Sequence, residues 1–101
     1  MNRVLDFAKK KVPFDWQEKS LGARLAYQID PDEPVERRRT VCALEVWCEC
    51  FGKDRRAFTQ REARQINAEL AELEHYRRST SAHCGPYGRQ RAFVRQFTPE
   101  E

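Results

Sequence analysis

Arginine side chains are concentrated toward the C-terminal end of this 101-residue chain. The segment 75–97, HYRRSTSAHCGPYGRQRAFVRQF, contains five arginines and no acidic residue. A guanidinium group binds phosphate oxygens through parallel hydrogen bonds, so clustered arginines favour contact with a nucleic-acid backbone. We therefore predict phosphate contacts for Arg77, Arg78, Arg89, Arg91 and Arg95. The alternative is a solvated charged face on a structural domain.

A second group of polar side chains lies just upstream, in the segment TQREARQINAELAEL (59–73). In a DNA major groove, arginine pairs with guanine and glutamine pairs with adenine. The start of a recognition helix usually makes these contacts. We predict such contacts for Gln60, Arg61, Arg64 and Gln65. Glu69, Glu72 and Glu74 make the later part acidic, so only the helix start is expected to approach DNA.

Capping signals define the helix that carries this second group. Thr59 is followed three residues later by Glu62, the pattern of a capping box. Apolar residues then recur at helical spacing: Ala63, Ile66, Leu70 and Leu73. An earlier helix is predicted over 41–51, with Thr40 as its N-cap and Gly52 as the left-handed residue that ends it. A buried strand is the competing interpretation, because this run also contains residues that suit a sheet.

The pattern changes to a period of two after residue 75. Arg91, Phe93, Arg95 and Phe97 alternate, which indicates a strand with one buried face. The turn Gly-Pro-Tyr-Gly at 85–88 separates this run from an earlier one, which predicts a hairpin. Tyr87 is expected to pack back on its own turn. Two helices followed by a basic hairpin are typical of a winged helix-turn-helix.

The N-terminal third is predicted to hold two short helices. One covers 2–12 and ends before Pro13, and the other covers 21–29 after the N-cap Ser20. We divide the chain into N-terminal helical segments and a linker (1–39), a winged-helix-like domain (40–97) and a disordered tail (98–101). The predicted fold class is mainly α with a small β-hairpin, with three to four helices and a basic wing.

The amino-acid composition is typical of a small soluble domain and argues against a membrane protein. Charged residues make up 35% of the chain and hydrophobic residues 40%, which suits a small, helix-rich, soluble domain. No apolar run approaches the roughly 20 residues that cross a bilayer, and the N-terminus lacks the apolar stretch of a signal peptide. The sequence therefore predicts a cytoplasmic protein without a membrane partner.

Metal and enzyme motifs are missing. The cysteines are Cys42, Cys48, Cys50 and Cys84, and neither they nor the two histidines have the spacing of a zinc site. We expect reduced thiols, packed beside Trp47. The chain has no phosphate-binding loop, nucleophile elbow or H-E-x-x-H motif. Glu45 and Glu49 are one turn apart and are expected on a solvated helix face. We predict no enzyme activity, cofactor, metal or small-molecule substrate.

Three blocks of the sequence resemble the C-terminal end of the virulence-associated protein E family. The likeness spans about 13–97 and is strongest from residue 40 onward. The matching positions are Trp47, Glu49, Cys50, Phe51 and Gly52; Thr59, Arg64, Ile66 and Asn67; and Gly85, Tyr87, Gly88, Gln90, Arg91, Phe93, Val94 and Arg95. Many relatives have Gly-Trp where this chain has Glu74, His75 and Tyr76.

Members of this family are mobile-element and prophage proteins with a helicase-like P-loop ATPase. The resemblance implies a non-catalytic C-terminal module of a replication ATPase that contacts DNA. Because these 101 residues lack the ATPase motif, the family's nucleotide chemistry is not implied for them. The alternative is a protein-interaction or oligomerisation module that docks on the ATPase core or on another replication protein. An exposed apolar patch at Trp16 and Leu21 would favour it.

Overall fold

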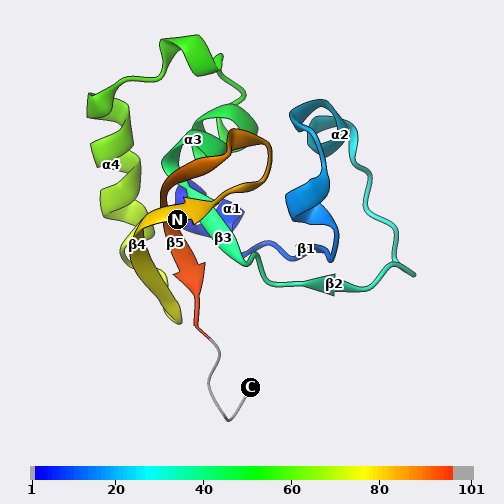
Figure 1. Ribbon diagram of the computed structural model, residues 1–101. Helices are drawn as coiled ribbons and strands as arrows, with labels where there is room; N and C mark the ends of the chain where they lie inside the picture. Colours follow the sequence, from blue (N-terminus) through cyan, green and yellow to red (C-terminus); the bar gives the residue numbers. More distant parts are fainter. Residues whose placement is uncertain (1, 97–101) are drawn as a thin grey trace.

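A three-stranded antiparallel sheet lies at the centre of the computed structural model, which describes residues 2–96 (Figure 1). The central strand is β5 (Arg89–Arg95). It pairs with β3 (Thr40–Cys42) on one side and with β4 (Tyr76–His83) on the other. The β4–β5 hairpin has an irregular register between Ser79 and Ala82, where β4 contains one extra residue. The two strands are joined by a 3₁₀ turn, Gly85–Tyr87.

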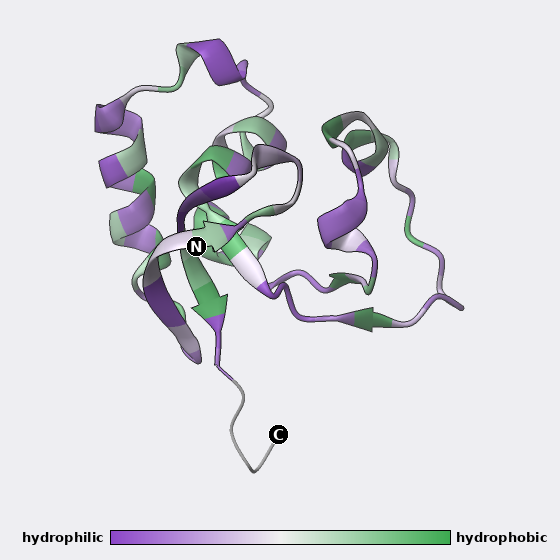
Figure 2. Cartoon of the chain, in the orientation of Figure 1, coloured by the Kyte–Doolittle hydropathy of each residue, from purple (hydrophilic) through white to green (hydrophobic). Residues whose placement is uncertain are grey.

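Three helical segments pack around this sheet. They are α1 (Arg3–Lys9), α3 (Ala43–Glu45) and α4 (Gln60–Leu70). α3 continues directly into a π-helical stretch, Val46–Cys50. Their apolar sides share one core with the sheet, which includes Val4, Ala8, Val41, Leu44, Val46, Trp47, Ile66, Leu70, Ala92 and Phe93. Figure 2 shows the contrast between this hydrophobic interior and the largely hydrophilic outer side of α4.

Local signals act as predicted at the start of α4 and at Gly52, whereas α1 ends at Lys9 rather than at residue 12. The Thr59 hydroxyl accepts a hydrogen bond from the Glu62 backbone N–H and caps α4. The Glu62 carboxylate accepts from the Thr59 hydroxyl rather than from its backbone. Gly52 has a φ of +66°, which confirms it as the left-handed residue after the helix. A 3₁₀ turn, Arg55–Ala57, lies between Gly52 and α4.

Residues 14–36 form an extension on the side of the molecule opposite α4, and we call it the acidic arm (Figure 1). It contains a 3₁₀ turn (Trp16–Glu18), α2 (Leu21–Ala26) and β2 (Val35–Glu36). β2 pairs with β1 (Val12–Pro13) in a two-stranded antiparallel ribbon. Ser20 caps α2 as predicted, by accepting from the backbone N–H of Ala23, although the helix ends at Ala26 rather than at residue 29.

The expectation of a mainly α fold is wrong. The described residues are 43% helix and 23% strand, with antiparallel sheets of two and three strands, so the fold is a mixture of α and β. The error lies at Thr40, which does not cap a helix because residues 40–42 pair with β5. The helix begins at Ala43, and Cys42 and Glu45 form its capping box.

The segment between the two later helices is longer than a helix-turn-helix turn, since residues 51–59 separate the π-helical stretch from α4. Within residues 2–96, no helix combines the length and apolar character needed to cross a bilayer. The predicted disordered tail (98–101) lies outside the described residues.

Candidate nucleic-acid interface

A groove between α4 and the β4–β5 hairpin gathers polar and basic side chains from three segments. It consists of two hollows, of about 480 and 240 Å³, that share Arg64, Asn67 and Arg91 in their walls. No carboxylate lines either hollow. We call this feature the basic groove and define it by its polar and charged side chains other than Thr59: Gln60, Arg64, Asn67, Arg78, Gln90 and Arg91.

Helical and strand periodicities bring these side chains together. On α4, Gln60, Arg64 and Asn67 follow one another at intervals of four and three, so they share one side of the helix. Ile66 and Leu70 lie on the core side and are buried. On β5, alternation places Arg91 on the same face of the sheet as Phe93.

The hairpin register adds Arg78 to the groove. Arg78 is directly opposite Phe93 in the β4–β5 ladder, and its guanidinium carbon lies 5.5 Å from the centre of the Phe93 ring. The Phe93 ring is buried and makes a cation–π contact with one face of the Arg78 guanidinium. Arg78 itself is exposed to solvent. The Phe93 ring therefore positions Arg78, and no ion pair within residues 2–96 neutralises its charge.

The groove arginines are available to a ligand. Arg64, Arg78 and Arg91 are all exposed. The ion pairs found within residues 2–96 involve other cations, namely Lys19, Arg24, Arg38, Arg39 and Arg56. Three guanidinium groups around a groove without carboxylates create a positive potential that attracts polyanions.

The remaining predicted contact residues lie elsewhere. Arg61 and Gln65 are exposed on α4 but do not line the groove. Arg77 is paired with Val94 and faces the opposite side of the sheet from Arg78. Arg89 shares the strand face of Arg91 near the turn, and Arg95 is half-buried opposite Tyr76 at the other end of β5. The structure thus brings together Gln60, Arg64, Arg78 and Arg91 out of the nine predicted residues.

A buried cluster of charges, which the sequence analysis missed, lies beneath the acidic arm. Glu45 Oε2 accepts hydrogen bonds from Arg24 Nη1 at 2.8 Å and Arg38 Nη1 at 3.0 Å. Arg24 Nη1 also donates to Glu49 Oε2 at 3.0 Å. The expectation that Glu45 and Glu49 lie on a solvated face is therefore wrong, because both carboxylates are buried and paired with Arg24. Burial raises the pKa of Glu45, and the guanidinium groups of Arg38 and Arg24 oppose that shift.

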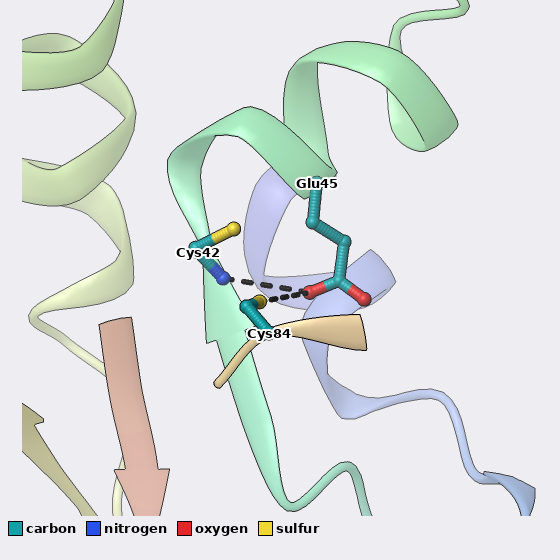
Figure 3. Close-up of side chains that lie close together, drawn as sticks. All are labelled: Cys42, Glu45 and Cys84. Carbon is teal, nitrogen blue, oxygen red and sulfur yellow. Dashed lines mark hydrogen bonds between the residues drawn. The ribbon is translucent and has the colours of Figure 1, made fainter. Parts of the chain in front are cut away.

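Figure 3 shows the other side of the Glu45 carboxylate, where two cysteines approach it. Glu45 Oε1 accepts from the Cys42 backbone N–H at 3.4 Å and from the Cys84 thiol at 3.8 Å. One ligand atom from each of these residues lies within 4.8 Å of the others, as in a metal site. However, four donors already occupy the roughly four lone-pair positions of the carboxylate, and two of them are cationic. The arrangement suits a structural contact better than a bound cation.

Three cysteine thiols and Tyr87 of the hairpin turn are also buried. Cys42, Cys48 and Cys84 are buried, as predicted, whereas Cys50 is half-buried. A hydrogen bond with Cys42, together with burial, raises the pKa of the Cys84 thiol, which makes it a poor nucleophile at neutral pH. Tyr87 is buried in the core, where its hydroxyl donates to Glu49 Oε2 at 2.6 Å and its ring lies beside the Arg24 guanidinium.

Comparisons with known proteins assign no family to this chain. No family model matches it, and no curated protein matches it at a significant level. The resemblance to the virulence-associated protein E family therefore remains a prediction from the residues themselves, and the candidate function depends on the geometry of the basic groove.

Proposed function

We propose that this protein is a non-catalytic, cytoplasmic module that contacts nucleic acid through the basic groove. The observation that carries the proposal is the convergence of Arg64, Arg78 and Arg91 on a groove without carboxylates. The family resemblance suggests a setting for the module, at the C-terminal end of a mobile-element or prophage replication ATPase.

The chemistry of the groove favours contact with a phosphodiester backbone. Each arginine that neutralises a phosphate releases condensed counterions, which is the main source of sequence-independent affinity. The amide groups of Gln60, Asn67 and Gln90 lie beside the arginines and can donate to sugar or phosphate oxygens. α4 lines the groove from Gln60 to Ala68, whereas Glu69 on α4 and the glutamates beyond its end, Glu72 and Glu74, do not line it.

A titration tests the proposal directly. Labelled duplex and single-stranded DNA are titrated with the protein at about 50 mM and 200 mM salt, because phosphate contacts weaken steeply over that range. The proposal predicts binding at the lower salt that falls strongly at the higher salt. Absence of binding to both DNA forms at low salt would refute it.

Adjacent arginines on β4 provide a matched pair of variants. Arg77 and Arg78 are both exposed and differ by one position, but they lie on opposite faces of the sheet. Each change to alanine removes the same charge. We expect Arg78→Ala to weaken DNA binding and Arg77→Ala to leave it nearly unchanged. Equal losses for both variants would mean that net charge, and not the groove, accounts for the binding.

A further inference from the structure

In the part of the chain that the structure describes, the exposed large hydrophobic side chains are confined to the acidic arm. Among residues 2–96, those classed as exposed are Phe14, Leu25, Ile29 and Val35, and all four lie between residues 14 and 36. Ile29 is 87% exposed and Leu25 is 60% exposed. Figure 2 shows hydrophobic stretches of the arm at α2 and β2, with hydrophilic residues between them. Such a concentration on one segment marks an interaction surface.

The apolar patch expected at Trp16 and Leu21 does not form, because Trp16 is buried and Leu21 is half-buried. Trp16 instead packs inward, with its ring centre 5.5 Å from that of Tyr27 and 4.9 Å from the Arg24 guanidinium carbon. These contacts hold α2 against the 3₁₀ turn within the arm, and the ion pairs of Arg24 with Glu45 and Glu49 attach α2 to the rest of the molecule. Leu25, the residue after Arg24 on the helix, is left pointing toward solvent.

The arm also carries a charge opposite to that of the remaining chain. Residues 14–36 contain six acidic and two basic side chains, a net charge of −4, so the other residues together carry +7. One of the two cations, Arg24, is buried in the ion-pair cluster. Within the described residues, Asp30, Asp32 and Glu33 make no ion pair, and they follow Ile29 directly.

We infer that the acidic arm is a docking surface for a basic amphipathic segment of a partner protein. The partner's apolar side chains would cover Leu25 and Ile29, and its lysines or arginines would pair with the carboxylates at 30–33. Charge complementarity selects this occupant. Nucleic acid and anionic membranes are repelled by a net charge of −4, and so is the arm of a second copy. The basic groove of a second copy contains no exposed large hydrophobic residue to cover Ile29.

The probe for this inference is a synthetic helix of leucine and lysine, about 18 residues and thus ~27 Å long. Its control replaces every lysine with glutamate and keeps the same apolar face. Both are titrated into the full, isotope-labelled chain, and backbone amide shifts are followed by NMR. We expect the lysine peptide to shift amides of residues 14–36 and to leave those of the basic groove unchanged. We expect no binding of the glutamate peptide.

Variants separate the apolar and charged contributions. The double variant Leu25→Ser, Ile29→Ser should lower the affinity for the lysine peptide by about tenfold or more, which corresponds to ~1.4 kcal/mol of binding free energy. Because both side chains are exposed, the fold should be unaffected. Neutralising the three carboxylates should reduce the salt dependence of the peptide affinity. The variant for this test combines Asp30→Asn, Asp32→Asn and Glu33→Gln. The matched control neutralises exposed acids outside the arm, Glu72→Gln and Glu74→Gln, and should change neither quantity.

Any of five results would overturn the inference, and the first four concern peptides and self-association. They are failure of the lysine peptide to bind, equal binding of the glutamate peptide, peptide shifts centred on the basic groove, and self-association of the free protein that Leu25→Ser and Ile29→Ser abolish. Binding of the arm to anionic vesicles would likewise assign it to a membrane. None of these measurements involves DNA, so their outcome tests the docking surface independently of the proposed nucleic-acid contact.

Discussion

Arg24 of α2 donates a 2.8 Å hydrogen bond to Glu45 of α3, and each side chain is only 1% exposed. The same guanidinium donates to the backbone carbonyl of Trp16 through Nε and Nη2. This contact joins the acidic arm to the helix that begins beside the central sheet. A buried ion pair adds little net stability compared with an apolar contact, but it accepts only one arrangement of donors and acceptors. We interpret the pair as the contact that fixes the position of the arm.

Arg24→Met should therefore be strongly destabilising. The substitution removes a positive charge that neutralises the buried Glu45 and Glu49 carboxylates. Loss of one partner from a buried ion pair costs about 3–5 kcal/mol of folding stability. Urea denaturation followed by circular dichroism measures the loss. The comparison variant is Arg56→Met, which breaks the exposed Arg56–Asp54 pair and should leave the unfolding midpoint unchanged. A midpoint for Arg24→Met equal to that of the wild type would contradict the role given to the buried pair.

Gly85→Ala tests how closely the hairpin turn approaches Arg24. Gly85 has a φ of +54°, and a Cβ placed there would overlap the Arg24 guanidinium. Gly52 has a similar φ of +66° but open space around it. We expect Gly52→Ala to cost about 1–2 kcal/mol from backbone strain alone, and Gly85→Ala to cost clearly more. Equal unfolding free energies for the two variants would show that the turn has room for a side chain.

Signals that lie close together in the sequence predicted much of the local structure. Ser20 and Thr59 each accept a hydrogen bond from the residue three positions on, and Gly52 acts through its own backbone conformation, so the local sequence is enough to predict them. At Thr40 the sequence favours a helix over the competing strand, because the strand's partner, Val94, is more than 50 positions away. Its residues suit either conformation, and only pairing with β5 decides between them.

The candidate site was predictable in part for the same reason. Strand alternation placed Arg91 with Phe93, but the choice between Arg77 and Arg78 depends on the register of β4 against β5. The buried cluster had one signal in the sequence, since Glu45 and Glu49 interrupt an otherwise apolar run (VCALEVWCECF). Two carboxylates one turn apart in such a run indicate a buried cation, although the sequence does not say that it is Arg24.

Alkaline pH should destabilise the protein through Tyr87. Burial and the hydrogen bond to Glu49 raise the pKa of Tyr87 above its ordinary value of 10.0. Above that pH the unfolded chain loses the phenolic proton and the folded chain keeps it, so stability present below about pH 10 is lost as the pH rises. The buried Cys48 and Cys84, whose pKa values are also raised, start this decline near pH 9.

Tyr87→Phe isolates the tyrosine contribution. The variant should be less stable by about 1–3 kcal/mol at pH 8, because Glu49 loses a donor. Its unfolding free energy should then fall less steeply than that of the wild type between about pH 10 and pH 11. Urea denaturation at each pH gives both curves. Parallel curves over this interval would mean that Tyr87 titrates normally in the folded protein.

Arg91→Ala should weaken nucleic-acid binding without changing its sequence preference. A side chain that neutralises one phosphate contributes about 0.9 to the slope of log affinity against log salt on duplex DNA. We therefore expect the variant to lose affinity by a similar factor on duplexes of different sequence and to lower the slope by about one, and Arg64→Ala with Arg91→Ala to lower it by about two. Arg37→Ala removes an exposed arginine outside the basic groove and should leave the slope unchanged. A loss for Arg91→Ala confined to one DNA sequence would instead indicate a base contact, and an unchanged slope would remove β5 from the contact surface.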